Sequence, residues 1–182
     1  GNTAYVNSLN LNSSSSKLSI ESDGTINGTI ADLTNGSAVV DLNRDYDSVA
    51  NSTIFGTEGK SIGTLNVGAS SSSINFSLGN LAYVNNISLN SSTSSITLND
   101  NGGLMGSFTG DGTVILDKNY TTTYETADTA NNKYNTEFGK NGNSINNVNV
   151  STGINLTLGT STYINNLNLD NDSILTLKDG SA

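Results

Sequence analysis

Three segments of this chain, about 80 residues apart, repeat one pattern of residues. The segment "GNTAYVNSLNLN" occupies residues 1–12, "GNLAYVNNISLN" residues 79–90 and "GTSTYINNLNLD" residues 159–170. Self-similarity at a fixed period indicates a repeat architecture, in which each unit packs on the next. We divide residues 1–182 into a single solenoid segment with internal repeats 1–78, 79–158 and 159–182, the last of them truncated.

Within each repeat, apolar side chains stand at every second position in short groups. The segments "INFSL" (74–78) and "INLTL" (154–158) show this alternation, with Ser, Thr or Asn between the apolar residues. It is the period of a β-strand that buries one face. Clusters of Gly, Asn, Asp and Ser between the groups predict tight turns. No segment of helical length carries an apolar stripe at the helical period, so we expect an all-β fold.

The spacing of the groups predicts the pitch of the fold. Leu65 and Ile87, and likewise Val148 and Leu167, hold corresponding places in groups that recur about every 20 residues. The sequence therefore predicts a right-handed parallel β-helix, or β-solenoid, of about 20 residues per coil. Hydrophobic residues make up 34% of the chain, which is low for a globule but matches the roughly six inward side chains that such a coil needs. Asn and Thr side chains outside are expected to hydrogen-bond from coil to coil.

Composition excludes or disfavours several functions. The chain has no Cys and no His, so it lacks disulfides, thiol nucleophiles and the commonest general base and metal ligand. Seven Lys and Arg against sixteen Asp and Glu give a net charge of −9, which makes nucleic acid a poor partner. No apolar run approaches the roughly 18 residues of a membrane span. We predict no nucleic-acid binding, no membrane insertion within this segment, no enzyme activity and no cofactor.

Two further patterns have competing interpretations. The segment "DLNRDYDS" (41–48) resembles the start of a calcium loop, but Tyr46 stands where such a loop has Gly and Ser52 where it has Glu. A solvated acidic turn is favoured, and no metal site is predicted. Tyr5, Tyr83 and Tyr163 mark one position of each repeat. Packing in the core or a groove is favoured for them over a spaced aromatic binding strip.

The second repeat is longer than the first at one place. Between Asp117-x-Asn119 and Phe138-Gly139 it carries seven more residues than the first repeat has between Asp41-x-Asn43 and Phe55-Gly56. Insertions in solenoids emerge as loops on one side, although tolerated sequence drift is the simpler alternative. We predict a loop over residues 120–137, whose candidate binding residues are Tyr120, Tyr124, Glu125 and Tyr134.

The segments "INFSLGN", "VNNISLNSSTSSITL" and "INLTLGT" resemble the passenger domains of Gram-negative autotransporters, and in particular the Asn- and Ser-rich surface antigens of rickettsial type. The resemblance covers the whole chain and rests on repeat texture. It implies a right-handed parallel β-helix at the bacterial cell surface or secreted, in a longer chain that ends in an outer-membrane barrel. It also implies a non-catalytic adhesin or its stalk, with a host cell-surface protein or glycan as partner. The absence of Cys suits a passenger that crosses the outer membrane unfolded. The alternative is an extracellular β-helix that binds or processes glycans.

Overall fold

The computed structural model describes residues 2–68, 72–124 and 128–178. Its strands and a 3₁₀ turn follow in this order: β1 (Thr3–Leu11), β2 (Lys17–Ile20), β3 (Thr25–Asp32), β4 (Val39–Leu42), β5 (Tyr46–Asp47), β6 (Thr53–Phe55), β7 (Ile62–Val67), β8 (Asn75–Leu78), β9 (Leu81–Leu89), β10 (Ser95–Leu98), β11 (Gly103–Leu116), β12 (Tyr120–Thr122), η1 (Thr129–Asn131), β13 (Lys133–Tyr134), β14 (Thr136–Phe138), β15 (Ile145–Val150), β16 (Asn155–Leu158), β17 (Ile164–Leu169) and β18 (Ile174–Leu177).

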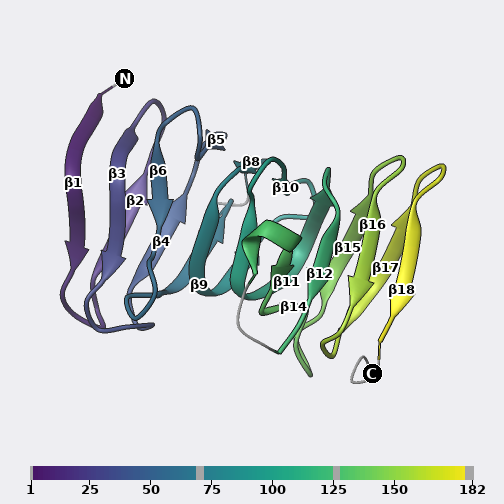
Figure 1. The fold of residues 1–182 in the computed structure, drawn as a ribbon. Helices are drawn as coiled ribbons and strands as arrows, with labels where there is room; N and C mark the ends of the chain where they lie inside the picture. Colours follow the sequence, from purple (N-terminus) through teal and green to yellow (C-terminus); the bar gives the residue numbers. More distant parts are fainter. Residues whose placement is uncertain (1, 69–71, 125–127, 179–182) are drawn as a thin grey trace.

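These strands wind into a β-solenoid of about 8 turns with roughly 22 residues per turn, which confirms the predicted all-β solenoid with a slightly longer coil. Figure 1 shows the strands lying across the long axis, with the chain ends at opposite ends of the stack. All pairings between the described strands are parallel, as in Val40 with Leu65 and Leu65 with Ile87. At about 4.8 Å per coil, eight coils make a stack on the order of 40 Å long.

The core is a set of apolar columns that run along the axis. One column consists of Leu65, Ile87, Phe108 and Phe138, which pair in register on successive coils and are fully buried. The rings of Phe108 and Phe138 stack with centroids 5.6 Å apart. Alternation along each strand supplies these inward side chains, and burying them in columns removes about 25 cal/mol of unfavourable hydration per Å² of apolar surface.

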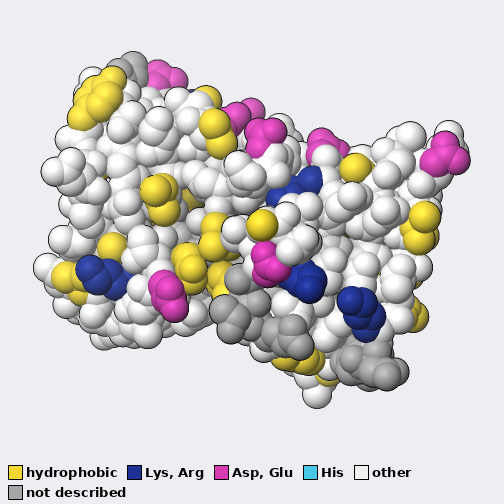
Figure 2. Space-filling model, viewed as in Figure 1, with side chains coloured by type: hydrophobic (Ala, Val, Ile, Leu, Met, Phe, Trp, Pro, Cys, Tyr) yellow, Lys and Arg dark blue, Asp and Glu magenta, His cyan; other side chains and the backbone are white. Residues whose placement is uncertain are grey.

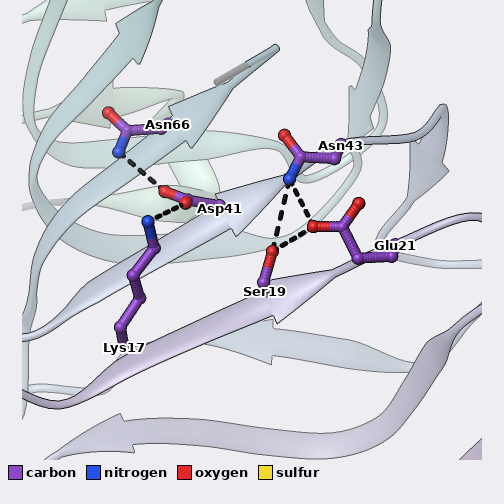
Figure 3. Close-up of polar contacts among 6 residues, drawn as sticks. All are labelled: Lys17, Ser19, Glu21, Asp41, Asn43 and Asn66. Carbon is purple, nitrogen blue, oxygen red and sulfur yellow. Dashed lines mark hydrogen bonds and ion pairs between the residues drawn. The ribbon is translucent and has the colours of Figure 1, made fainter. Parts of the chain in front are cut away.

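Polar side chains form a second, outer set of contacts between coils (Figure 3). Lys17 on β2 lies 2.6 Å from the carboxylate of Asp41 on β4, which also accepts a 2.8 Å hydrogen bond from Asn66 on β7. Asn43 donates to Glu21 at 2.6 Å. The hydrogen bond and charge of Asp41 raise the pKa of Lys17, and hydrogen bonds from Ser19 and Asn43 lower the pKa of Glu21. Asn side chains therefore bond from coil to coil as predicted.

The acidic segment 41–48 is also used for internal contacts. Besides the contacts of Asp41, the Asp45 carboxylate accepts a 2.7 Å hydrogen bond from the backbone N–H of Asn75. Asp47 accepts from the N–H groups of Val49 and Ala50, each at 2.9 Å. These carboxylates cap turns and join coils. The expectation of a solvated turn fails for Asp41, which lies on β4 and is buried.

Candidate functional site in the second repeat

A hydrogen-bonded bracket inside the first repeat provides a reference for the second. The hydroxyl of Tyr46 lies 2.7 Å from Thr53 Oγ1 and accepts a 3.1 Å hydrogen bond from the N–H of Ile26. Thr53 in turn donates to the carbonyl of Ile26. All three residues are buried. The bracket joins β5 to β6 and holds both against Ile26 on β3 of the preceding coil.

The second repeat contains the same bracket. Tyr120 lies 2.7 Å from Thr136 Oγ1 and accepts a 3.1 Å hydrogen bond from the N–H of Leu104, while Thr136 donates to the carbonyl of Leu104. Tyr46 and Thr53 are 7 positions apart, whereas Tyr120 and Thr136 are 16 apart. The insertion is therefore nine residues long, and the predicted length of seven is wrong.

Pairing Asn43 with Asn119 by their shared letters is out of register by two residues. Asp45 accepts a hydrogen bond from the N–H of Asn75, and Asn119 accepts one from Asn155 in the same way. The structure thus equates Asp45 with Asn119, rather than Asn43 with Asn119. The shared Asp-x-Asn letters are a coincidence of an Asn- and Asp-rich chain.

Two of the four predicted binding residues lie in the core. Tyr120 and Tyr134 are 1% and 0% exposed, and their rings stack with centroids 4.8 Å apart. Burial raises the pKa of both hydroxyls. The expectation that they project from a loop as contact groups is corrected, because each lies on a strand, β12 or β13, with its side chain buried in the core. Instead they anchor the two ends of the insertion.

The ring of Tyr134 occupies space that the second repeat opens for it. A Cβ added at Gly103 would lie 2.1 Å from this ring, and the repeat places Thr25 at the equivalent position of the first copy. Lys118 donates from Nζ to the Tyr134 hydroxyl at 2.9 Å and to the carbonyl of Gly102 at 3.2 Å. Burial lowers the pKa of Lys118. The insertion is thus built into the core at its C-terminal end.

Between its anchors the insertion adds a strand and a short turn to the side of the stack. β13 pairs with β12 through Thr121 with Lys133, and Asp128 caps η1 by accepting from the N–H of Asn131 at 3.3 Å. Hydrogen bonds from the side chain and backbone of Asn131 lower the pKa of Asp128. In Figure 1 this 3₁₀ turn stands on the front of the stack.

Tyr124 is the predicted site residue that the structure leaves on the surface. Its side chain is 55% exposed, and its hydroxyl accepts a 2.9 Å hydrogen bond from the N–H of Ser161 on the following coil. It borders a hollow of about 280 Å³ that is also lined by Thr121, Lys133 and Lys178. The fourth predicted residue, Glu125, lies outside the described residues.

Sequence reasoning missed the lysines of this hollow. Lys133 lies within the insertion, but no sequence motif marks it. Lys178 comes from the third repeat, far away in sequence. Only the pairing of β12 with β16, and of β16 with β18, brings Lys178 to the insertion. The repeat could have predicted the position of Lys178, because it aligns β16 and β18 with β12 on successive coils.

Charged side chains are scattered over the face that carries the insertion. Figure 2 shows Lys and Arg in small groups among Asp and Glu, on a face that consists mostly of uncharged side chains and backbone. Within residues 2–68, 72–124 and 128–178, no three Asp or Glu side chains gather as a metal site would need. No helix in this part of the chain is long and apolar enough to cross a membrane.

Comparison with known proteins gives no match: no family model, no curated protein and no solved structure is significantly similar to this chain.

Proposed function

We propose that this chain is a non-catalytic binding module, a rigid β-solenoid that presents the second-repeat insertion to a partner at a cell surface. The observation that carries the proposal is the anchoring of the insertion: Tyr120 and Tyr134 are stacked in the core at 4.8 Å, and Gly103 makes room for one of them. Sequence drift would leave a loop outside an unchanged core. Here the core itself has changed to hold the loop.

The surface of the insertion suits binding. Tyr124 offers an amphipathic ring whose hydroxyl is already held by Ser161 N–H, so little side-chain freedom is lost on contact. The nearby Lys133 and Thr121 add polar groups to the same hollow. Loops on a rigid scaffold are the usual place for recognition.

The autotransporter resemblance supplies the setting of the proposal. An all-parallel solenoid without Cys is compatible with a passenger displayed at the bacterial surface or secreted, with a host cell-surface protein or glycan as partner. The same fold serves many functions, so it supports this setting without identifying it. The outer-membrane barrel remains part of the proposal.

The first repeat provides the matched variant for a test. Residues 121–134 are replaced by "DSVAN", the first-repeat segment 47–51, and Gly103→Thr fills the space left by the Tyr134 ring. We expect wild-type protein to adhere to cultured epithelial cells or to immobilised matrix proteins, and the replaced protein to lose most of that adhesion while its β-rich circular dichroism spectrum is unchanged. Tyr124→Ala should weaken adhesion several-fold, and Val49→Ala, at a 52% exposed site on the first-repeat turn, should not.

Equal adhesion by the wild-type and replaced proteins would show that the insertion is not the binding surface. Absence of adhesion by the wild type on every surface would indicate a passive stalk.

A further inference from the structure

A second hollow lies on a different surface of the solenoid, beside the repeat tyrosine Tyr83. Its volume is about 390 Å³, and Tyr83, Asn85, Met105, Asn135, Glu137 and Lys140 line it. Tyr83 and Met105 are paired neighbours on β9 and β11, and the next coil follows through Gly106 with Thr136. The hollow therefore runs along the solenoid axis over successive coils. None of its lining residues belongs to the insertion surface around Tyr124.

The backbone is shaped to open this hollow. The register between β9 and β11 shifts at Met105 and Ser107, so Asn85 is an extra residue bulged out opposite Gly106. Gly106 has a φ of 150°, and a Cβ there would lie 1.8 Å from the carbonyl oxygen of Val84. Bulges re-aim side chains and are common beside binding sites. The same bulge occurs in the first repeat at Gly28, where φ is 141°, but there Tyr5 lies at the end of the stack and is 79% exposed.

Tyr83 is therefore not a core residue, and neither are its counterparts. We expected these tyrosines to pack in the core or in a groove. Tyr5 and the 38% exposed Tyr163 stand in the end coils and are not core residues. Tyr83 is half-buried in a groove with neighbours on both sides.

The polar side chains that line this hollow are available to a ligand. Several Asn side chains on other faces are instead bonded between coils, as Asn168 is to Asn149 at 2.8 Å. Across the described part of the chain, the side-chain polar atoms of Tyr83, Asn85, Asn135 and Glu137 make no hydrogen bond to one another or to the rest of the protein. Their donors and acceptors remain for a ligand.

Ring and polar groups together match the chemistry of a sugar. A pyranose ring has an apolar face that packs on an aromatic side chain and hydroxyls that bond to amides and carboxylates, which Tyr83, Met105, Asn85 and Glu137 offer side by side. A peptide strand would need a free sheet edge, and the backbone groups of β9 and β11 are already paired. Nucleic acid would need more positive charge than a chain of net charge −9 provides.

We propose that the Tyr83 hollow binds a linear polysaccharide of pyranose rings, laid along the solenoid axis. Coils follow one another about every 4.8 Å, and a linear polysaccharide advances by a similar length per sugar, so consecutive sugars meet consecutive coils. Tyr83 and Met105 carry the ring faces, and Asn85, Asn135 and Glu137 bond the hydroxyls.

The test uses soluble oligosaccharides of defined length, from di- to hexasaccharides of the cellulose and chitin series, with isothermal titration calorimetry on the intact chain. We expect saturable binding by one series, with affinity rising up to about four sugars and then levelling off, since the lining spans about four coils when Ser61 before β7 is included. Tyr83→Ala should weaken binding at least about tenfold, as the loss of one stacking platform does. Tyr83→Phe should retain it, and Glu137→Gln should weaken it only a few-fold.

Two controls separate this surface from the insertion. Val49→Ala and the "DSVAN" replacement, which keeps Asn135, should bind oligosaccharides like wild type even though the replacement loses adhesion. Absence of binding to every hexasaccharide, or unchanged affinity in a folded Tyr83→Ala protein, would overturn the proposal. Reduced cell adhesion by Tyr83→Ala without any oligosaccharide binding would also overturn it, because the partner would then be a protein.

Discussion

The first and second repeats carry the same core bracket but differ in what lies between its two ends. In the first repeat, Tyr46 and Thr53 are joined by a tight turn, and in the second, Tyr120 and Thr136 enclose a strand, a 3₁₀ turn and Tyr124. Both tyrosines bond to the same kinds of partner at the same distances. The bracket therefore fixes the position at which the chain returns to the stack, whatever the length of the loop between its ends. Doubling the enclosed loop adds only about 0.6 kcal/mol of closure entropy.

Before the bracket it is the first repeat that carries an additional loop. In the first repeat a loop separates β3 from β4, and the buried carboxylate of Asp32 accepts hydrogen bonds from the N–H groups of Gly36, Ser37 and Ala38 at 2.7 to 3.1 Å. In the second repeat β11 runs without interruption from Gly103 to Leu116. One repeat thus depends on an internal carboxylate where the other depends on continuous strand pairing.

The largest expected effect concerns the shared bracket. Tyr46→Ala and Tyr120→Ala each remove a buried ring and leave an N–H without its partner, so each should cost about 3–5 kcal/mol in the free energy of unfolding. Urea denaturation followed by circular dichroism measures both. If the two brackets are equivalent, the two losses agree within about 1 kcal/mol. A loss at Tyr120 far below that at Tyr46 would mean that the insertion is not anchored in the core.

A smaller expected effect is a pH dependence of stability that comes from Asp32 in the first repeat. Burial by itself would raise the pKa of Asp32, but the hydrogen bonds from Thr34, Ala38 and Ser37 outweigh it and lower the pKa from 3.8 to about 2. A lowered pKa means that the stabilisation is complete above about pH 4 and is lost as the pH falls towards 2. It amounts to about 2 kcal/mol.

Asp32→Asn should therefore lower the stability by about 2 kcal/mol at pH 7 and flatten its dependence on pH between 4 and 2. Urea midpoints measured at pH 2, 3, 4 and 7 provide the check. An unchanged pH profile in the variant would assign the acid sensitivity to other carboxylates, such as Glu21 or Asp128.

The solenoid could be predicted from the sequence because the alternating pattern recurs in many strands. Every strand repeats the same alternation, so columns such as Leu65, Ile87 and Phe108 follow from the period and the pitch alone. Register within the insertion could not be predicted in this way. A shift of two residues preserves the alternation, so pairing Asn43 with Asn119 satisfied the pattern although Asp45 is the true counterpart.

The site was predicted only in part because tyrosine suits both the core and the surface. The sequence pattern does not distinguish the buried Tyr120 and Tyr134 from the exposed Tyr124. That distinction depends on the hydroxyl partners at Leu104, on the preceding coil, and at Lys118, just before β12. The hollow beside Tyr83 depends on a bulge that only strand pairing reveals.

The insertion is anchored in the core but leaves the pairing register of the strands that follow it unchanged, so both repeats return to the same register. Because the chain has no Cys, paired cysteines test this directly: Val39 pairs with Thr64, and their counterparts Thr113 and Asn147 pair across the insertion. We predict that Val39→Cys with Thr64→Cys and Thr113→Cys with Asn147→Cys form disulfides to a similar extent under mild oxidation, since neighbouring strands bring the Cα atoms to about 5 Å. Failure of the second pair, or equal cross-linking by Thr113→Cys with Asn149→Cys, which lie two residues out of register, would contradict it.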